Sequence, residues 1–130
     1  MKKVLVFFLL INTWLLSGEL VWQQDVPTAV AKAKAEQKNI VLIVEATYCK
    51  WCKKLKRETL SDAQVIRRLQ NYVLVKVRRC DKEAMKILPS QHYAAPTTFF
   101  MTPELETIEK AIGYFNAQDF LSYINDVESE

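Results

Sequence analysis

The stretch NIVLIVEATYCKWCKKLK, residues 39–56, joins two kinds of pattern. Residues 39–47 form a mostly β-branched apolar run, which is typical of a strand buried on both faces of a sheet. The tetrad CKWC follows at once at 49–52, and residues 53–60 have helical character. The sequence therefore predicts that two cysteines three positions apart lie where a buried strand ends and a helix begins.

Strand and helix patterns alternate along the rest of the chain. The predicted helices are 26–38, 53–60, 61–70, 81–88 and 116–127, and the predicted strands are 39–47, 72–77, 97–101 and 107–113. Strands separated by helices pair in parallel, whereas the last two strands are close enough for an antiparallel hairpin. We therefore predict an α/β fold with a central mixed sheet of four to five strands flanked by helices.

The amino terminus has the pattern of a signal peptide. Two lysines precede a 13-residue apolar run, residues 4–16, and two small residues follow it. The run is shorter than the ~20 residues that a membrane-spanning helix needs. We predict a signal peptide over residues 1–18, one domain over 19–130 and a periplasmic location. An uncleaved anchor is the alternative, because Leu15 and Leu16 stand where a cleavage site prefers small residues.

Composition and charge exclude several classes of site. Two glycines are too few for a Gly-rich phosphate loop, and one histidine excludes a multi-histidine metal site. Residues 38–86 hold thirteen basic and five acidic residues, whereas 104–130 hold one basic and seven acidic residues. Nucleic-acid binding is not expected, because the basic residues lie on several elements without an aromatic platform. The uneven charge is typical of two solvated faces, and the alternative is a positive field around the cysteine pair.

Three chemistries compete for Cys49 and Cys52. Zinc needs four ligands, and the remaining candidates, Cys80 and His92, stand apart in the chain. A structural disulfide would close a very small loop and would constrain the unfolded chain little. Redox chemistry has a direct physical basis, because a cysteine at a helix N-terminus faces unpaired N–H groups that stabilise its thiolate. In that interpretation the protein needs no metal and no cofactor other than its own disulfide.

The redox interpretation gives each residue of the tetrad a role. Cys49 is the exposed nucleophile, and Cys52, one turn into the helix, resolves the mixed disulfide. Lys50 adds positive charge that stabilises the thiolate. Tyr48 and Trp51 are candidates for substrate binding, with Trp51 either an apolar plate for partners or a side chain that packs on the fold.

Three motifs carry a resemblance to a known family. They are W-x-x-D…A-x-x-K-A-x-x-x-x-K-x-I at 22–40, CKWCKKLKRETLSDAQV at 49–65 and YAAPTTFF at 93–100. Together they resemble the thioredoxin superfamily, and most of all the periplasmic branch that includes the C-terminal domain of the transmembrane thiol:disulfide interchange reductase. The resemblance implies that Pro96 is preceded by a cis peptide bond and packs beside the disulfide. The backbone of Ala95 would then pair with an extended substrate peptide.

The resemblance also implies an activity and partners. We expect a thiol:disulfide oxidoreductase that acts on exported proteins with cysteine thiols or disulfides and receives electrons from a membrane thiol-redox donor. Reduction is favoured over isomerisation or oxidation because the resemblance is to a reductase domain. However, Lys50-Trp51 replaces the Gly-Pro typical of thioredoxins, and the lysine favours a more oxidising pair. A monomer is expected, because no dimerisation segment is visible. The alternative from another class is a binding module or chaperone.

Glu45 stands out because family reductases carry a buried aspartate six residues before the first cysteine. Ile43 occupies that position here, and Glu45 follows on the same face of the predicted strand. A charged, unpaired carboxylate in an apolar strand costs several kcal/mol. We hypothesise that Glu45 is catalytic and carries the proton for Cys52. The alternative is an ion pair with a lysine such as Lys53 or Lys56.

Two further residues are placed by their sequence context. Cys80 follows a predicted strand, and we expect a buried, inert thiol there. An intermolecular disulfide or a regulatory thiol is the alternative. His92 is expected in a surface loop, without a role.

Overall fold

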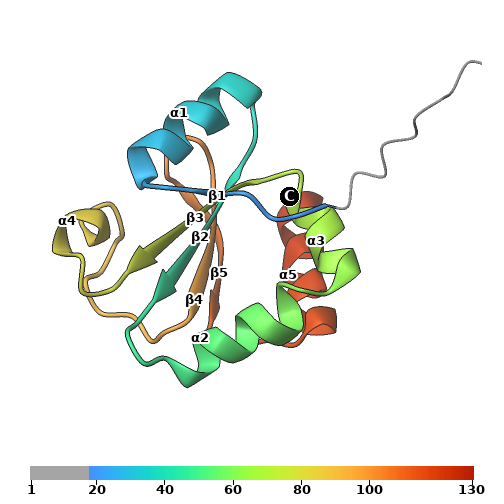
Figure 1. The fold of residues 1–130 in the computed structure, drawn as a ribbon. Coiled ribbons are helices and arrows are strands. Elements are labelled where there is room, and N and C mark those ends of the chain that lie inside the picture. The colour runs from blue at the N-terminus through green and yellow to red at the C-terminus, as the bar shows by residue number, and fades with distance from the viewer. Residues whose placement is uncertain (1–17) are drawn as a thin grey trace, which may run out of the picture.

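In the computed structural model, helices cover both faces of a five-stranded sheet (Figure 1). The structure describes residues 18–130, so the predicted signal peptide lies outside the described residues except for Gly18. No helix within that part of the chain is long and apolar enough to cross a membrane. The strand order is β1-β3-β2-β4-β5, which confirms the predicted mixed α/β sheet.

The sheet is built around one central strand. β2 (Ile40–Glu45) pairs in parallel with β3 (Val73–Arg78) and antiparallel with β4 (Thr97–Met101). β4 pairs antiparallel with β5 (Thr107–Ile112), which confirms the predicted hairpin edge. β1 (Trp22–Gln23) adds a parallel edge strand beside β3. The sequence did not predict β1, because two residues are too few to show a strand pattern.

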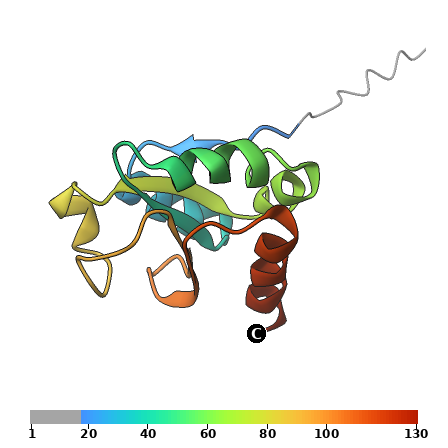
Figure 2. The same ribbon diagram turned by 90° about the horizontal axis from the view of Figure 1, so that it is seen from below.

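The helices form two layers, as Figures 1 and 2 show. One layer contains α1 (Val26–Glu36) and α4 (Lys82–Met85), and the other contains α2 (Lys50–Lys54), the π-helix η1 (Leu55–Thr59), α3 (Ala63–Leu69) and α5 (Ala117–Ser129). Asp25 caps α1 and Asn116 caps α5, as predicted. α4 is shorter than the predicted helix 81–88.

The central strand fills both cores because its side chains alternate between the two faces. Ile40, Leu42 and Val44 pack in the core on the side of α1 and α4. Val41 and Ile43 pack in the core on the side of α3 and α5. This two-sided burial explains why residues 40–44 are uniformly apolar, and it holds the end of β2 rigidly beside the loop that carries the cysteines.

Tyr72 joins the start of β3 to the last helix. It is buried, and its hydroxyl donates a hydrogen bond to Glu128 Oε1 at 3.2 Å. Arg68 pairs with the same carboxylate, at 2.5 Å between Nη2 and Oε2. Burial raises the pKa of Tyr72, and the negative charge of Glu128 raises it further.

We predict that Tyr72 makes stability fall at alkaline pH. Because its pKa is higher in the folded state, the unfolded chain loses this proton first. The contribution of the protonated Tyr72 to the free energy of unfolding is therefore complete below about pH 10, and it is lost as the pH rises from there toward the pKa of Tyr72 in the folded state. Between about pH 9 and pH 11, urea denaturation should show the wild type losing about 1 kcal/mol more of its free energy of unfolding than Tyr72→Phe. Equal losses in the two proteins would contradict this role for Tyr72.

Candidate active site

Two loops meet at one edge of the sheet because of the register between β2 and β4. Val44, near the end of β2, pairs with Thr97, the first residue of β4. The loop that leaves β2 therefore lies beside the loop that enters β4. The first loop carries Cys49 and the second carries Ala95, and the two residues are 46 positions apart in the chain.

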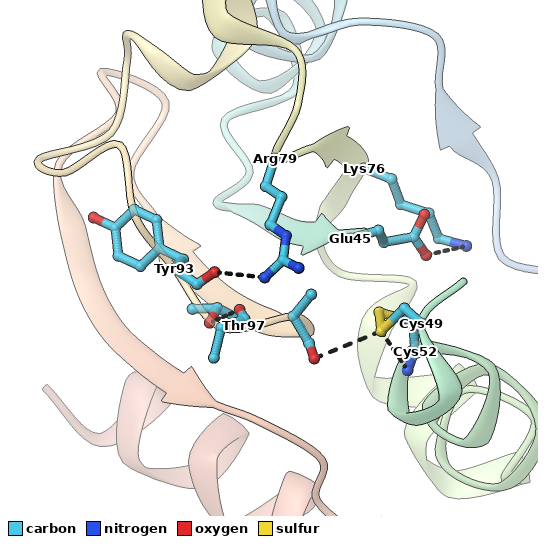
Figure 3. The surroundings of a disulfide bond; sticks show 9 residues. Glu45, Cys49, Cys52, Lys76, Arg79, Tyr93 and Thr97 are labelled. Carbon is cyan, nitrogen blue, oxygen red and sulfur yellow. Dashed lines mark hydrogen bonds and ion pairs between the residues drawn. A yellow bond between two sulfur atoms is a disulfide. The ribbon is translucent and has the colours of Figure 1, made fainter. Parts of the chain in front are cut away.

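Cys49 and Cys52 form a disulfide with an S–S distance of 2.12 Å. Cys49 is the N-cap of α2, and its Sγ accepts a hydrogen bond of 3.1 Å from the backbone N–H of Cys52 (Figure 3). Cys49 is half-buried, whereas Cys52 is only 9% exposed. Cys49 is thus the more exposed residue of the two, and its sulfur is the one that receives an N–H from the helix start, as the nucleophile role requires.

The second loop presents a backbone carbonyl to the disulfide. The Ala95–Pro96 peptide bond is cis, and the carbonyl oxygen of Ala95 lies 3.5 Å from Cys49 Sγ. Pro96 is buried, and its own carbonyl accepts a 2.7 Å hydrogen bond from the N–H of Gly113. The Thr97 hydroxyl donates to the carbonyl of Ala94 at 2.7 Å. These bonds fix the loop against the sheet. In the reduced state, the Ala95 carbonyl is an acceptor within reach of the Cys49 thiol.

Trp51 both packs on the fold and remains open to solvent. Its ring centroid lies 6.0 Å from that of Tyr114, and the ammonium groups of Lys50 and Lys54 each lie 5.3 Å from it. The residue is nevertheless 47% exposed. Tyr48, directly before the disulfide, is 95% exposed and has a left-handed backbone with φ 56°. Two solvent-exposed aromatic residues therefore stand within two positions of Cys49 in the chain.

A hydrogen bond anchors the aromatic support beneath Trp51. The Tyr114 hydroxyl donates to Glu58 Oε2 at 2.7 Å. This bond raises the pKa of Tyr114 and lowers the pKa of Glu58, because it favours the state in which the tyrosine holds the proton and the glutamate is charged. The anchored tyrosine limits the positions that the Trp51 ring can take.

Glu45 has its ion pair with a residue that the sequence did not indicate. Its Oε1 lies 3.6 Å from the ammonium of Lys76 on β3, and Figure 3 shows the carboxylate turned toward that lysine. Lys76 is the diagonal cross-strand neighbour, since Glu45 pairs directly with Arg78. The predicted partners Lys53 and Lys56 come from the helix that follows, whereas the parallel pairing brings Lys76 closer. The proton-carrier role of Glu45 stays a prediction.

The expectation of a buried thiol at Cys80 is wrong. Cys80 is a free and exposed cysteine. β3 ends at Arg78, so Cys80 already belongs to the turn before α4, where no core covers it. His92 is exposed in the loop that leads toward Pro96, as expected.

Residues 21–103 match the family described as thioredoxin-like. This chain belongs to the thioredoxin-like family. Two curated relatives are both thiol:disulfide interchange proteins DsbD. The protein from Campylobacter jejuni is 30% identical over 89 residues, which cover 67% of this chain and 16% of the relative. The protein from Pseudoalteromonas atlantica is 25% identical over 108 residues, 79% of this chain and 18% of the relative. The chain thus spans less than a fifth of these relatives.

Solved structures agree in fold. A thioredoxin from Thermus thermophilus has a TM-score of 0.70 at 24% identity and covers 83% of this chain and 86% of its own. The oxidised C-terminal domain of DsbD from Neisseria meningitidis has a TM-score of 0.61 at 19% identity, with 76% and 89% covered. A putative disulphide-isomerase from Bacteroides thetaiotaomicron has a TM-score of 0.73 at 23% identity, with 87% and 97% covered.

We predict that Glu45→Gln slows the resolving step and changes its pH dependence. A glutamine keeps the shape of the side chain but cannot take a proton from Cys52, so resolution should slow roughly tenfold or more. The measurement is the decay rate of a preformed mixed disulfide on Cys49, taken between about pH 6 and pH 9. Glu83→Gln is the matched control, because Glu83 also pairs with a lysine, Lys86, but on α4. An unchanged pH profile in Glu45→Gln would rule out the proton-carrier role.

Proposed function

We propose that this protein is a periplasmic thiol:disulfide oxidoreductase that reduces disulfides in exported proteins. The observation that carries the proposal is the position of Cys49 Sγ, which receives the N–H of Cys52 and lies beside the Ala95–Pro96 loop. A sulfur that accepts a hydrogen bond at a helix start is stabilised as a thiolate, which is the reactive form. Membership of the thioredoxin-like family supports the same chemistry.

The proposed reaction transfers two electrons from the dithiol to a substrate disulfide. The Cys49 thiolate attacks one substrate sulfur, which forms a mixed disulfide and releases the other substrate sulfur as a thiolate. The Cys52 thiolate then attacks Cys49 Sγ and releases the second substrate thiolate. The Cys49–Cys52 disulfide closes, and each released thiolate takes up a proton. The burial of Cys52 suits this order, because substrate reaches Cys49 first.

Substrate binding is proposed for the surface around Cys49. The half-buried backbone of Ala95 would pair with an extended substrate segment, as in the addition of a strand. The exposed rings of Tyr48 and Trp51 would contact side chains on either side of the substrate cysteine. Lys50 would add to the stabilisation of the thiolate, because its charge is held near the start of α2 by the Trp51 ring.

The proposed direction of electron transfer and the proposed electron donor are supported by the similarity to the two DsbD relatives. Their printed name describes thiol:disulfide interchange, and we propose that a membrane thiol-redox donor returns the disulfide to the dithiol state. Isomerisation or oxidation is the enzymatic alternative. A binding module that holds partners without exchange is the alternative from another class, and the exposed aromatic pair beside Cys49 is the feature that favours it.

We predict that Cys49→Ser abolishes the reduction of insulin disulfides, with the rate falling to the uncatalysed background. Cys52→Ser should keep the first step and accumulate the mixed disulfide, which mass spectrometry detects as an adduct on Cys49. Cys80→Ser is the matched control and should reduce insulin at the wild-type rate. A binding module would instead keep its partner in Cys49→Ser, and a wild-type chain that reduces no insulin would contradict the proposed enzyme.

Alkylation trapping in intact cells tests the direction. The reductase proposal expects the Cys49–Cys52 pair to be mostly reduced, because a donor maintains the dithiol. A mostly oxidised pair would contradict the reductase direction and indicate an oxidant.

A further inference from the structure

We propose that two cationic hollows flanking Cys49 select substrate segments that carry acidic residues next to the target disulfide. The proposal rests on the proposed function, since it names the substrate class of the same site. It starts from the hollows themselves, of which one includes Tyr48 and Lys50 on either side of Cys49, and the other includes Ala94, next to Ala95. The first is formed by α2 and η1, and the second by the turn after β3 together with the loop before Pro96.

The first hollow is a cationic stripe on the helix that begins at Cys49. It has a volume of about 370 Å³ and is lined by Tyr48, Lys50, Lys53, Lys54 and Arg57. Lys53, Lys54 and Arg57 lie three, four and seven residues after Lys50, which puts each of them on the side of the helix that Lys50 occupies. The stripe therefore runs outward from the reactive sulfur, on the side where Tyr48 is open to solvent.

The second hollow continues the positive surface beyond the Ala95–Pro96 loop. Its volume is about 790 Å³, and its lining is Arg79, Cys80, Lys82, Gln91, His92, Tyr93 and Ala94. The Arg79 guanidinium donates to the carbonyl of Tyr93 at 3.3 Å, which holds its charge toward this loop (Figure 3). A peptide that pairs with Ala95 would pass close to both hollows.

Both hollows keep an excess of positive charge among the residues that line them. Lys50 and Lys53 form no ion pair within residues 18–130, and Lys54 and Arg57 share one carboxylate, Glu58, at 4.0 and 3.6 Å. That carboxylate also accepts the hydrogen bond from the Tyr114 hydroxyl. No carboxylate lines the second hollow. Nearby Asp81 accepts a hydrogen bond from the N–H of Ala84 as the cap of α4.

The excess positive charge favours an acidic partner for a physical reason. Surface potentials of one sign raise the encounter rate of oppositely charged partners and lower that of like-charged ones. The effect reaches about 10 Å at 0.1 M salt, which covers the residues on either side of a substrate cysteine bound at Cys49. Arg57 lies about two turns along the helix from Cys49, so its charge acts more on a bound partner than on the sulfur.

The experiment compares three disulfide-cyclised peptides that differ only in the two residues flanking one cysteine, which are Glu, Gln or Lys. The reduced full chain reduces each peptide, and the reaction is followed by acid quench and chromatography, which separates any peptide adduct on the exposed Cys80 from the reduced peptide. At low salt we expect the Glu peptide to react roughly tenfold faster than the Lys peptide, with the ratio falling toward one at high salt. Equal rates for the three peptides would overturn the proposal and leave the proposed function intact.

A charge-reversal variant tests whether the first hollow causes the preference for the Glu peptide over the Lys peptide. The double variant Lys53→Glu/Arg57→Glu should lose the preference or favour the Lys peptide. The matched control is Lys32→Glu/Lys34→Glu, which makes the same change in net charge on exposed positions of α1, across the sheet from α2. The control should keep the wild-type ratio. If both variants lower the ratio of the Glu-peptide rate to the Lys-peptide rate equally, the net charge of the whole molecule causes the preference, and the proposal is overturned.

Binding without chemistry separates this proposal from the proposed function. Linear peptides with serine in place of cysteine are titrated with the oxidised full chain, and binding is measured by fluorescence anisotropy. The proposal expects tighter binding in the order Glu, Gln, Lys, whether or not the chain reduces disulfides. Equal binding of the three peptides would overturn the proposal.

A second copy of the chain is the other occupant that the first hollow could have, through the acidic segment 104–130. If sedimentation shows a dimer and Lys53→Glu/Arg57→Glu releases a monomer, the proposal also fails.

Discussion

The pairing of β2 with β4 brings two loops that are 46 residues apart in the chain to the same edge of the sheet. Because Val44 pairs with Thr97, the cysteine loop and the Ala95–Pro96 loop meet without any segment of their own to join them. β2 is buried on both faces, so a slip of one residue would move each of its side chains from one core into the other and disrupt the packing of both. The geometry of the site therefore follows from the core, and the core follows from the apolar run that precedes the cysteines.

One sulfur has both a structural and a chemical part in this arrangement. Cys49 Sγ caps α2 by accepting the N–H of Cys52, and the same N–H stabilises negative charge on that sulfur. The surrounding side chains add rigidity, since Glu58 anchors Tyr114, and Tyr114, Lys50 and Lys54 contact Trp51. The effect of the charged side chains on partner proteins is separate from this rigidity, because these side chains extend along α2 and η1 beyond the CKWC tetrad.

The sequence predicted those features that depend on local pattern. The buried strand, the hairpin and the caps at Asp25 and Asn116 follow from periodicity and capping chemistry. Features that depend on long-range pairing were missed. The partner of Glu45 is Lys76 because of the parallel register between β2 and β3, which no local pattern reveals. Cys80 is exposed because β3 ends at Arg78, two residues earlier, and strand ends are poorly defined by sequence.

We propose that the position of Cys49 at the start of α2, rather than its exposure, makes it the reactive thiol. The reduced full chain offers an internal comparison, because Cys80 is exposed and Cys49 only half-buried. Iodoacetamide reacts with thiolates, so limited alkylation at about pH 6.5 followed by peptide mass spectrometry ranks the three cysteines by thiolate content and access. We expect that Cys49 is modified first, well ahead of Cys80 and Cys52. Modification of Cys80 at the same rate as Cys49, or faster, would contradict it.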